Sequence, residues 1–289
     1  MKIGFIGLGN MGLPMAENLQ KAGYEVTGFD IKKNINTVIK ISNSFENFLI
    51  DNDVIFTMLP SGKEVSAVYN EIVAKSISSR IMIDCSTIDI KSTHSITELA
   101  KKHKLQTLDA PVSGGVVGAN DGTLTFMVGG DQKAFEKVKP LFEIMGKKAV
   151  YCGKSGSGQA AKMCNNMILG ISMIGVCEAF TLADKIGLDI EKLYEVSSNS
   201  SGSCWALNTY CPAPGIGPET PADNNYEPGF SSDLMLKDLS LAQNAAEQTN
   251  SHTPLGLHAM QIYEELMKEG GQGKDFSYVL PLFSKKSRN

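Results

Sequence analysis

Lys162 and Asn166 are two residues whose types and spacing suit proton transfer. They stand four residues apart in a segment with helical spacing of apolar residues, so both are expected on one face of a helix. Lys162 is flanked by Ala160, Ala161 and Met163, and partial desolvation there favours the neutral amine, which exchanges a proton with a hydroxyl group. The residues alone leave a second interpretation open, because a lysine in the first turn of a helix is usually a solvated charge.

A second candidate site is the segment Asp109-Ala-Pro-Val-Ser113-Gly114-Gly115, which follows a predicted strand. The carboxyl ends of strands in α/β sheets are where ligands bind. Ser113 offers a hydroxyl group, and the backbone amides of Gly114 and Gly115 are open to close approach, so together they can hold a carboxylate. From the residues alone, a plain turn explains the two glycines equally well.

Two other strand ends and one helix add polar or apolar groups to a ligand crevice predicted at the carboxyl ends of the strands. Leu59 and Pro60 end one strand and offer an apolar wall against adenine or ribose, and Thr87 follows another strand with a hydroxyl group. Lys237 lies in a predicted helix after a loop rich in proline and glycine. It is either an ordinary surface charge or a further cation of the site.

Residues 3–30 predict dinucleotide binding. An apolar strand leads into Gly7-x-Gly9-x-x-Gly12, a helical segment and a second strand follow, and Asp30 closes the unit. In this arrangement the first glycine permits a tight turn, the second admits a pyrophosphate, and the third lets the helix pack closely on the strand. The N-terminus of the helix faces the phosphates, and the carboxylate of Asp30 accepts hydrogen bonds from the adenosine ribose.

Asp30 also predicts which dinucleotide is preferred. A carboxylate accepts hydrogen bonds from a free ribose 2′-hydroxyl but repels a 2′-phosphate, so NAD is expected rather than NADP. Lys32 and Lys33 are the local cations that would have to offset this repulsion. Residues 31–45 show no recognisable pattern, so the remainder of the adenosine pocket is not defined by the sequence.

The composition is typical of a soluble globular protein, and the cysteines favour the cytoplasm. The net charge of −4 gives no sign of binding to nucleic acid or to a membrane surface, and 42% hydrophobic residues are ordinary for a packed core. Six scattered cysteines without a C-x-x-C pair are interpreted as reduced thiols, and no cluster of Cys and His has the spacing of metal ligands. The apolar run 163–182 contains two asparagines and a glutamate, so we interpret it as a buried helix rather than a membrane span.

The order of predicted elements indicates an N-terminal Rossmann-type α/β domain, a doubly wound and mostly parallel sheet, followed by an all-α C-terminal domain joined by a long helix. We place the dinucleotide-binding domain at 1–158 and a helical substrate and oligomerisation domain at 159–289. The apolar helices of the second half predict a homodimer or homotetramer. Strands are expected at 3–6, 24–29, 54–58, 80–84, 106–109, 124–128 and 148–151, and helices near 63–74, 91–102, 132–145, 159–184, 190–198, 232–249 and 254–268, with an irregular loop at 211–229.

Four motifs resemble those of the β-hydroxyacid dehydrogenase family, and the resemblance covers nearly the whole chain. They are Gly4-Phe-Ile-Gly-Leu-Gly-Asn-Met-Gly12, the segment from Asp109 to Gly115, Gly156-Ser-Gly-Gln-Ala-Ala-Lys162-Met-Cys-Asn-Asn166, and Lys237-Asp238. The resemblance implies an NAD-dependent oxidoreductase that needs no metal, with Lys162 as the catalytic lysine and Asn166 beside it.

The same resemblance implies roles for the other candidate residues. It assigns Ser113, Gly114 and Gly115 to the substrate carboxylate, and Lys237 to the substrate and the nicotinamide end of the cleft. It places at the cofactor Gly7, Gly9, Asn10, Met11, Gly12, Asp30, Leu59, Pro60, Thr87, Phe230 and Lys237.

Within the family, three further segments are similar to the 3-hydroxyisobutyrate dehydrogenases of valine breakdown. They are Ser200-Ser-Gly-Ser-Cys-Trp205, Tyr210-Cys-Pro-Ala-Pro-Gly215, and Asn224-Asn-Tyr226 with Gly229-Phe230. The similarity implies oxidation of 3-hydroxyisobutyrate to methylmalonate semialdehyde. A reductase of another small semialdehyde, such as tartronate or succinic semialdehyde, remains an alternative. A non-catalytic NAD-binding protein is a lesser one, because both Lys162 and Asn166 are present.

Overall fold

A computed structural model describes residues 1–75 and 79–286 of the chain. The chain divides into two compact units, the first comprising Met1–Lys162 and the second beginning at Met163. The division lies inside the long helix that the sequence analysis assigns to the second domain.

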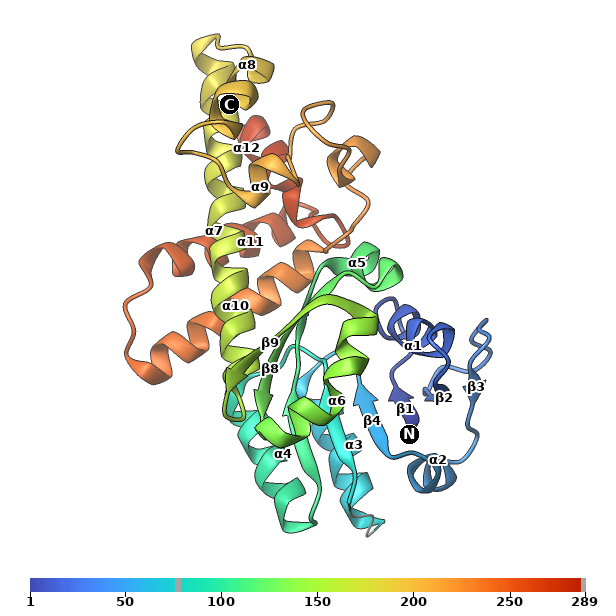
Figure 1. Cartoon of the computed structure of the whole chain (residues 1–289). Helices are drawn as coiled ribbons and strands as arrows, with labels where there is room; N and C mark the ends of the chain where they lie inside the picture. Colours follow the sequence, from blue (N-terminus) through green and yellow to red (C-terminus); the bar gives the residue numbers. More distant parts are fainter. Residues whose placement is uncertain (76–78, 287–289) are drawn as a thin grey trace. The chain divides into compact units, whose positions relative to one another are not determined.

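The first unit is built on a nine-stranded sheet in the described part of the chain, with the strand order β3-β2-β1-β4-β5-β6-β8-β7 and with β9 paired to β8. The six strands from β3 to β6 are parallel, whereas β8 runs antiparallel to both β6 and β7. The predicted mostly parallel sheet is therefore confirmed (Figure 1). The strands are β1 (Lys2–Ile6), β2 (Glu25–Phe29), β3 (Lys40–Ile41), β4 (Val54–Thr57), β5 (Ile81–Asp84), β6 (Gln106–Asp109), β7 (Val112–Ser113), β8 (Leu124–Gly130) and β9 (Gly146–Gly153).

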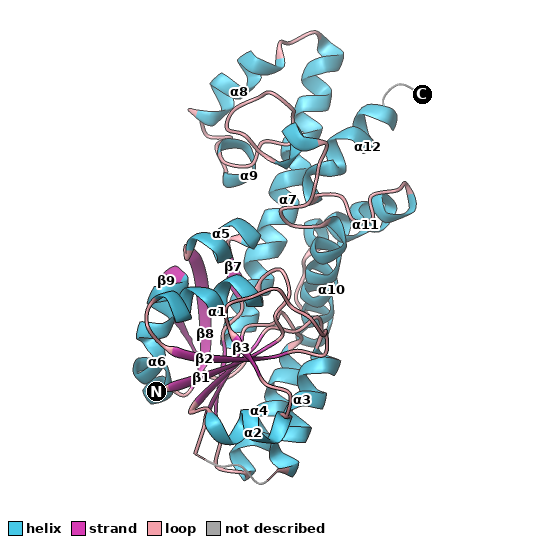
Figure 2. Ribbon diagram, turned by 90° about the vertical axis from the view of Figure 1, so that its right-hand side faces the viewer, coloured by secondary structure: helices cyan, strands magenta, loops and turns pink. Residues whose placement is uncertain are grey.

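Helices cover both faces of this sheet, as Figure 2 shows. One face buries apolar side chains of α1, α5 and α6 against the strands, and the other buries those of α2, α3 and α4. Strands covered on both faces carry continuous apolar runs, such as the fully buried β4 and β5. The helices are α1 (Gly12–Lys21), α2 (Phe45–Asp51), α3 (Gly62–Ala74), α4 (Ile90–Lys102), α5 (Gly115–Asp121) and α6 (Gln132–Met145).

The strand order reverses direction beside β1, which lies between β2 and β4. In open α/β sheets this switch point, at the carboxyl ends of the strands, is where ligands bind. The loops that leave β1, β2, β4, β5 and β6 at this end contain most of the residues that the sequence analysis selected in the first half of the chain. The fold therefore gathers these loops along one edge of the sheet.

The second unit is helical where it is described. Its helices are α7, whose bounds Ser157–Ile186 begin in the first unit, α8 (Ile190–Ser198), α9 (Trp205–Asn208), α10 (Ser232–Thr249), α11 (Pro254–Lys268) and α12 (Val279–Lys286), with short 3-10 turns η1 (Pro221–Asn224) and η2 (Phe276–Tyr278). Buried side chains from α7, α10 and α11 form its core together with Phe276 and Val279. The starts of α8, α10 and α11 match the prediction because Asp189 and Ser231 cap two of them and Pro254 opens the third.

The predicted irregular loop at 211–229 is irregular, yet it is firmly anchored. Asp275 has no exposed surface, and its Oδ2 accepts hydrogen bonds from the hydroxyl of Tyr210 at 2.9 Å and from the amides of Gly229 and Phe230 at 3.0 and 3.1 Å. Its Oδ1 accepts from the amide and hydroxyl of Ser277. Burial raises the pKa of Asp275 even though these bonds favour the carboxylate. One side chain thus ties both ends of the loop to η2.

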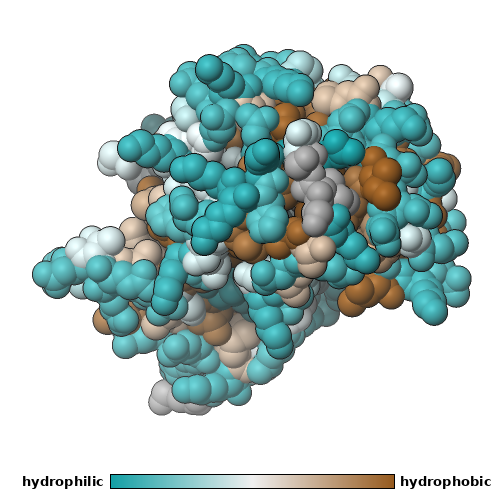
Figure 3. Space-filling view, turned by 90° about the horizontal axis from the view of Figure 1, so that it is seen from below, coloured by the Kyte–Doolittle hydropathy of each residue, from teal (hydrophilic) through white to brown (hydrophobic). Residues whose placement is uncertain are grey.

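The surface seen from below the view of Figure 1 is mainly hydrophilic, and hydrophobic side chains lie there singly or in small groups (Figure 3). Of the described helices, α7 is long and apolar enough to cross a membrane by length and composition, but 44% of that window is buried inside the structure. Asn166 lies within it and is hydrogen-bonded to a buried carboxylate. These are properties of a helix in a protein core.

Candidate active site

The glycine-rich loop connects β1 to α1 with very little space between them. A Cβ atom at Gly12 would lie 1.9 Å from the carbonyl oxygen of Gly7, so only glycine allows the helix to approach the strand this closely. Gly7 itself has a φ of +90°, and a Cβ there would lie 2.2 Å from the carbonyl of Met58. At Gly9 no atom lies within 4 Å of a Cβ position, so the backbone is open to a ligand. This is the geometry that a pyrophosphate requires at a helix N-terminus.

Asp30 follows β2 directly and faces this loop. Its Oδ2 accepts a hydrogen bond from the amide of Leu8 at 2.7 Å, and its Oδ1 accepts one from the amide of Lys32 at 2.7 Å. A carboxylate has about four lone-pair sites, so it can still accept from ribose hydroxyls. Asn10 and Met11 complete the loop between Gly9 and Gly12.

The loops after β4 and β5 are linked to each other by Ser86. The hydroxyl of Ser86 accepts a hydrogen bond from the amide of Leu59 at 2.9 Å, and Thr87 is the next residue in the chain. Pro60 is exposed, while Leu59 and Thr87 are half-buried. The two loops that hold the predicted cofactor contacts Leu59, Pro60 and Thr87 are therefore fixed relative to each other.

Ser113, Gly114 and Gly115 form the turn between β7 and α5. Gly114 has a φ of +133° and Gly115 a φ of +62°, both in the region that favours glycine. Ser113 ends the strand, Gly114 caps the helix and Gly115 begins it. Successive backbone amides in such a turn can converge on an anion, so the turn is suited to a carboxylate.

Lys162 and Asn166 lie one turn apart on α7, as predicted, and are 6% and 1% exposed. In the second unit, Nδ2 of Asn166 donates a hydrogen bond to Oδ2 of Asp238 on α10 at 2.6 Å. Oδ1 of Asn166 accepts one from Nδ2 of Asn165 at 3.0 Å. The orientation of Asn166 is therefore set by a buried carboxylate that the sequence analysis noted as part of a motif but did not select.

Lys237 is the neighbour of Asp238 on α10, and its ammonium lies 3.8 Å from Oδ1 of Asp238. Its side chain is one-third exposed, so it is not a fully solvated surface charge. Phe230 precedes the same helix, packs edge-on against Phe276 with ring centroids 5.7 Å apart, and is held through its amide by Asp275. Within the second unit, Asn166 on α7 thus contacts Asp238 on α10, and Lys237 is the neighbour of Asp238 on that helix.

Sequence reasoning assigned no role to two buried carboxylates at neighbouring strand ends, Asp84 on β5 and Asp109 on β6, although Asp109 begins one of the motifs. Asp109 accepts hydrogen bonds from the amides of Gly156 and Gln159, and burial nevertheless raises its pKa. Oδ1 of Asp84 accepts from the hydroxyl of Thr57 and the amide of Ser86, whereas its Oδ2 has no hydrogen-bond partner in the described structure. The signal that could have found them is an acid at the end of an apolar strand, but their partners are distant in sequence.

Burial raises the pKa of Asp84 from its ordinary value of 3.8 to about 6, with the charge of Asp109 adding to the effect and the two hydrogen bonds opposing it. The folded chain therefore binds this proton more tightly than the unfolded chain, so ionisation of Asp84 lowers stability as the pH rises from about 4 to about 6, and the penalty is constant above that. We expect Asp84→Asn to remove a penalty of up to about 3 kcal/mol at neutral pH. The melting temperature of the variant minus that of the unaltered chain should increase from pH 4 to pH 7. A difference that does not change with pH would contradict this prediction.

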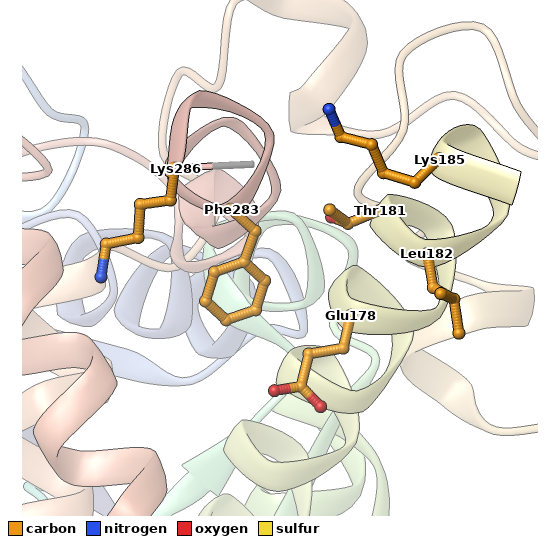
Figure 4. A pocket seen from close by; sticks show the side chains of 6 residues that line it. All are labelled: Glu178, Thr181, Leu182, Lys185, Phe283 and Lys286. Atoms are coloured by element: carbon orange, nitrogen blue, oxygen red, sulfur yellow. The ribbon is translucent and has the colours of Figure 1, made fainter. Parts of the chain in front are cut away.

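A hollow of about 320 Å³ in the second unit contains none of the predicted site residues. Figure 4 shows that Glu178, Thr181, Leu182 and Lys185 line it from α7, and Phe283 and Lys286 from α12. Lys286 is paired with Glu265 at 2.5 Å. No group of three or more His, Cys, Asp or Glu side chains suited to a metal ion occurs among the described residues.

Two family matches together cover almost the whole chain. Residues 2–153 match the family described as the NAD binding domain of 6-phosphogluconate dehydrogenase. Residues 156–283 match the family described as the NAD-binding domain of NADP-dependent 3-hydroxyisobutyrate dehydrogenase. The two matches meet near the start of α7.

Individual relatives are similar over most of their length. A mitochondrial 3-hydroxyisobutyrate dehydrogenase of Drosophila melanogaster is 45% identical over 98% of this chain and 89% of its own. An NAD-dependent L-serine dehydrogenase of Pseudomonas aeruginosa is 43% identical over 98% of this chain and 97% of its own. A solved structure of Mycobacterium tuberculosis 3-hydroxyisobutyrate dehydrogenase with L-serine is 42% identical, covers 97% of this chain and 98% of its own, and has a TM-score of 0.92.

Proposed function

The chain belongs to the β-hydroxyacid dehydrogenase family as an NAD-dependent enzyme of the 3-hydroxyisobutyrate dehydrogenase type, and on this premise we propose that it oxidises 3-hydroxyisobutyrate to methylmalonate semialdehyde. The observation that carries the proposal is the placement of Lys162. It is a buried lysine in the first turns of a helix that begins at the carboxyl ends of the strands. A buried amine at that position is suited to proton exchange with a hydroxyl group.

The residues present fit NAD. The open backbone at Gly9, the close approach of Gly12 to Gly7 and the carboxylate of Asp30 are the features that pyrophosphate and adenosine ribose require. We assign Asn10, Met11, Leu59, Pro60 and Thr87 to the walls of the same site. The roles of Phe230 and Lys237 at the cofactor stay predictions from the family resemblance. When bound, NAD supplies the hydride acceptor for the oxidation.

The chain's own residues then hold the substrate and move a proton. We propose that Ser113 and the amides of Gly114 and Gly115 hold the substrate carboxylate, which leaves the hydroxyl group to face Lys162. The neutral amine of Lys162 takes the hydroxyl proton during oxidation, and its ammonium returns the proton to the aldehyde oxygen during reduction. Asn166, fixed by Asp238, keeps the amine and the hydroxyl aligned. Lys237 adds positive charge near the acidic substrate.

L-serine is a second candidate substrate. It shares the carboxylate and the β-hydroxyl group of 3-hydroxyisobutyrate, and one relative of 43% identity is named as an L-serine dehydrogenase. The similar solved structure is described with L-serine. Reduction of tartronate or succinic semialdehyde is a further alternative that the family motifs leave open.

A panel of substrates tests the proposed function. We expect kcat/KM with NAD⁺ to be higher for 3-hydroxyisobutyrate, tried as both enantiomers, than for L-serine, glycerate and 4-hydroxybutyrate. Initial rates followed by NADH absorbance give all of these values on one preparation. A higher kcat/KM for L-serine or glycerate would reassign the substrate but not the family.

We also propose that the enzyme is a cytoplasmic homodimer or homotetramer that assembles through its second unit. The support is apolar surface on α7, where Ile168, Leu182 and Ile186 are each at least 60% exposed. Such exposure on one long helix is typical of an interaction surface. Sedimentation equilibrium gives the mass directly, and a monomer at micromolar concentration would contradict the proposal.

A further inference from the structure

Gln159 is a fully buried side chain that joins the start of α7 to the loop after β5. Its Oε1 accepts a hydrogen bond from the amide of Ile88 at 3.1 Å, and its Nε2 donates one to the carbonyl of Ser86 at 2.8 Å. These two peptide groups stand on either side of Thr87. One amide side chain therefore holds the backbone around Thr87 from both directions, in the way that a neighbouring strand would.

The main chain of Gln159 is fixed as firmly as its side chain. Its amide donates to Oδ2 of Asp109 at 3.1 Å, and the amide of Gly156 donates to Oδ1 of the same carboxylate at 2.8 Å. Gly158, between them, lies so close to the sheet that a Cβ there would be 2.3 Å from the carbonyl of Met127. The first turn of α7 therefore has no room to shift, and Lys162 follows Gln159 in the next turn.

The contacts of Gln159 reach a third segment through Ser86. The carbonyl of Ser86 accepts from Gln159, while its hydroxyl accepts from the amide of Leu59 at 2.9 Å. The loops after β4 and β5 and the first turn of α7 are thus one connected set of hydrogen bonds. All of these contacts lie within the first unit.

We propose that Gln159 is a positioning residue. It fixes the loop that contains Thr87 relative to the turn of α7 that contains Lys162, so that cofactor binding and proton transfer both depend on it. The proposal rests on the function proposed above for Lys162. Without the amide, the carbonyl of Ser86 and the amide of Ile88 become buried groups with no partner, and both flank Thr87. Loss of Gln159 should therefore weaken cofactor binding as well as turnover.

Gln159→Leu, which fills similar space without polar atoms, is the direct test. We expect the Kd for NADH, measured by fluorescence titration, to rise and kcat to fall, each by roughly 10- to 100-fold. Asn52→Leu is the matched control, because Asn52 is 1% exposed and its Nδ2 donates a buried hydrogen bond to the carbonyl of Phe48 at the opposite end of the strands. It should lower the melting temperature and leave the Kd and kcat within about twofold of the unaltered enzyme.

Gln159→Glu keeps the proposal testable if the leucine variant does not fold. A protonated glutamic acid can accept from Ile88 and donate to Ser86, as glutamine does, whereas the carboxylate cannot donate. Burial beside Asp84 and Asp109 favours the protonated form, and Lys162 and His94 on α4 oppose it. The NADH affinity of this variant, divided by that of the unaltered enzyme at the same pH, should therefore fall as the pH rises from 6 to 9.

Measurements of NADH binding and of turnover distinguish a failure of this proposal from a failure of the function on which it rests. If Lys162→Ala retains turnover, the role proposed for Lys162 fails, but the NADH titrations of the Gln159 variants remain valid. The positioning role is overturned if Gln159→Leu keeps its Kd and kcat within about twofold while only its melting temperature falls. It is equally overturned if the relative NADH affinity of Gln159→Glu does not change with pH.

Discussion

Lys162→Ala should lower kcat by roughly 10²- to 10⁴-fold, the range for removal of a positioned acid–base group. The side chain is 6% exposed, so bulk water cannot easily replace its amine. The affinity for NADH should stay within a few-fold, because Lys162 is proposed to act on the substrate hydroxyl group and not on the phosphates. Steady-state rates with 3-hydroxyisobutyrate and a fluorescence titration with NADH measure the two quantities separately.

Lys162→Arg separates the contribution of positive charge to turnover from the contribution of proton transfer. An arginine keeps the positive charge but does not give up its proton at accessible pH, so it should restore little of the lost turnover. Lys154→Ala is the matched control, because Lys154 is an exposed lysine just before the same helix. Turnover of Lys162→Ala within a few-fold of the control would remove Lys162 from the mechanism.

Asp30→Asn should have the second largest effect, on the choice between NAD⁺ and NADP⁺. Two like charges 4 Å apart repel by about 4 kcal/mol at an effective dielectric constant near 20, which is about a thousandfold in kcat/KM before screening. Asparagine keeps one acceptor oxygen, so it removes the charge and retains one of the two hydrogen bonds that Asp30 accepts from the amides of Leu8 and Lys32. We expect the preference for NAD⁺ to narrow by at least about tenfold in this variant.

Asp53→Asn provides the comparison for this change. Asp53 is exposed to solvent and, like Asp30, accepts a hydrogen bond from a backbone amide, that of Lys2 in β1 at 2.9 Å, but it lies at the other end of the strand. Its replacement should leave the cofactor ratio unchanged. Equal or better kcat/KM with NADP⁺ in the unaltered enzyme would show that Lys32 and Lys33 outweigh the carboxylate.

The parts of the fold that sequence predicts well are those determined by local signals. The bounds of α6 and α8 are matched because Asp131 and Asp189 cap them, each accepting from the first turn. The short elements β3 and α2 lie partly in the stretch without a recognisable pattern, although Ser44 caps α2. The helix α5 is harder to predict because it begins at Gly115 and contains Gly118, and glycine disfavours helix.

In the site, too, the motifs within one segment can be predicted from the sequence, whereas the contacts between distant segments cannot. The glycine spacing from Gly7 to Gly12 and the step from Lys162 to Asn166 are local, so the sequence contains them directly. Asp109 and Gln159 are 50 residues apart, and Asn166 and Asp238 are 72 apart. A single sequence does not contain these pairings, because they arise only when strands and helices have packed. The positioning residues are therefore found from the structure.

The anchorage of the loop at Asp275 implies an order of events while the chain is being synthesised. The first unit is a compact body of residues up to Lys162, so this unit can fold while later residues are still inside the ribosome. The second unit has to wait, because the loop that begins at Tyr210 and ends at Phe230 is held at both ends by Asp275 and at Asn225 by Lys274, and both residues come later in the chain. A nascent chain stalled before this aspartate would present a finished nucleotide-binding half beside an untethered loop that is open to proteases.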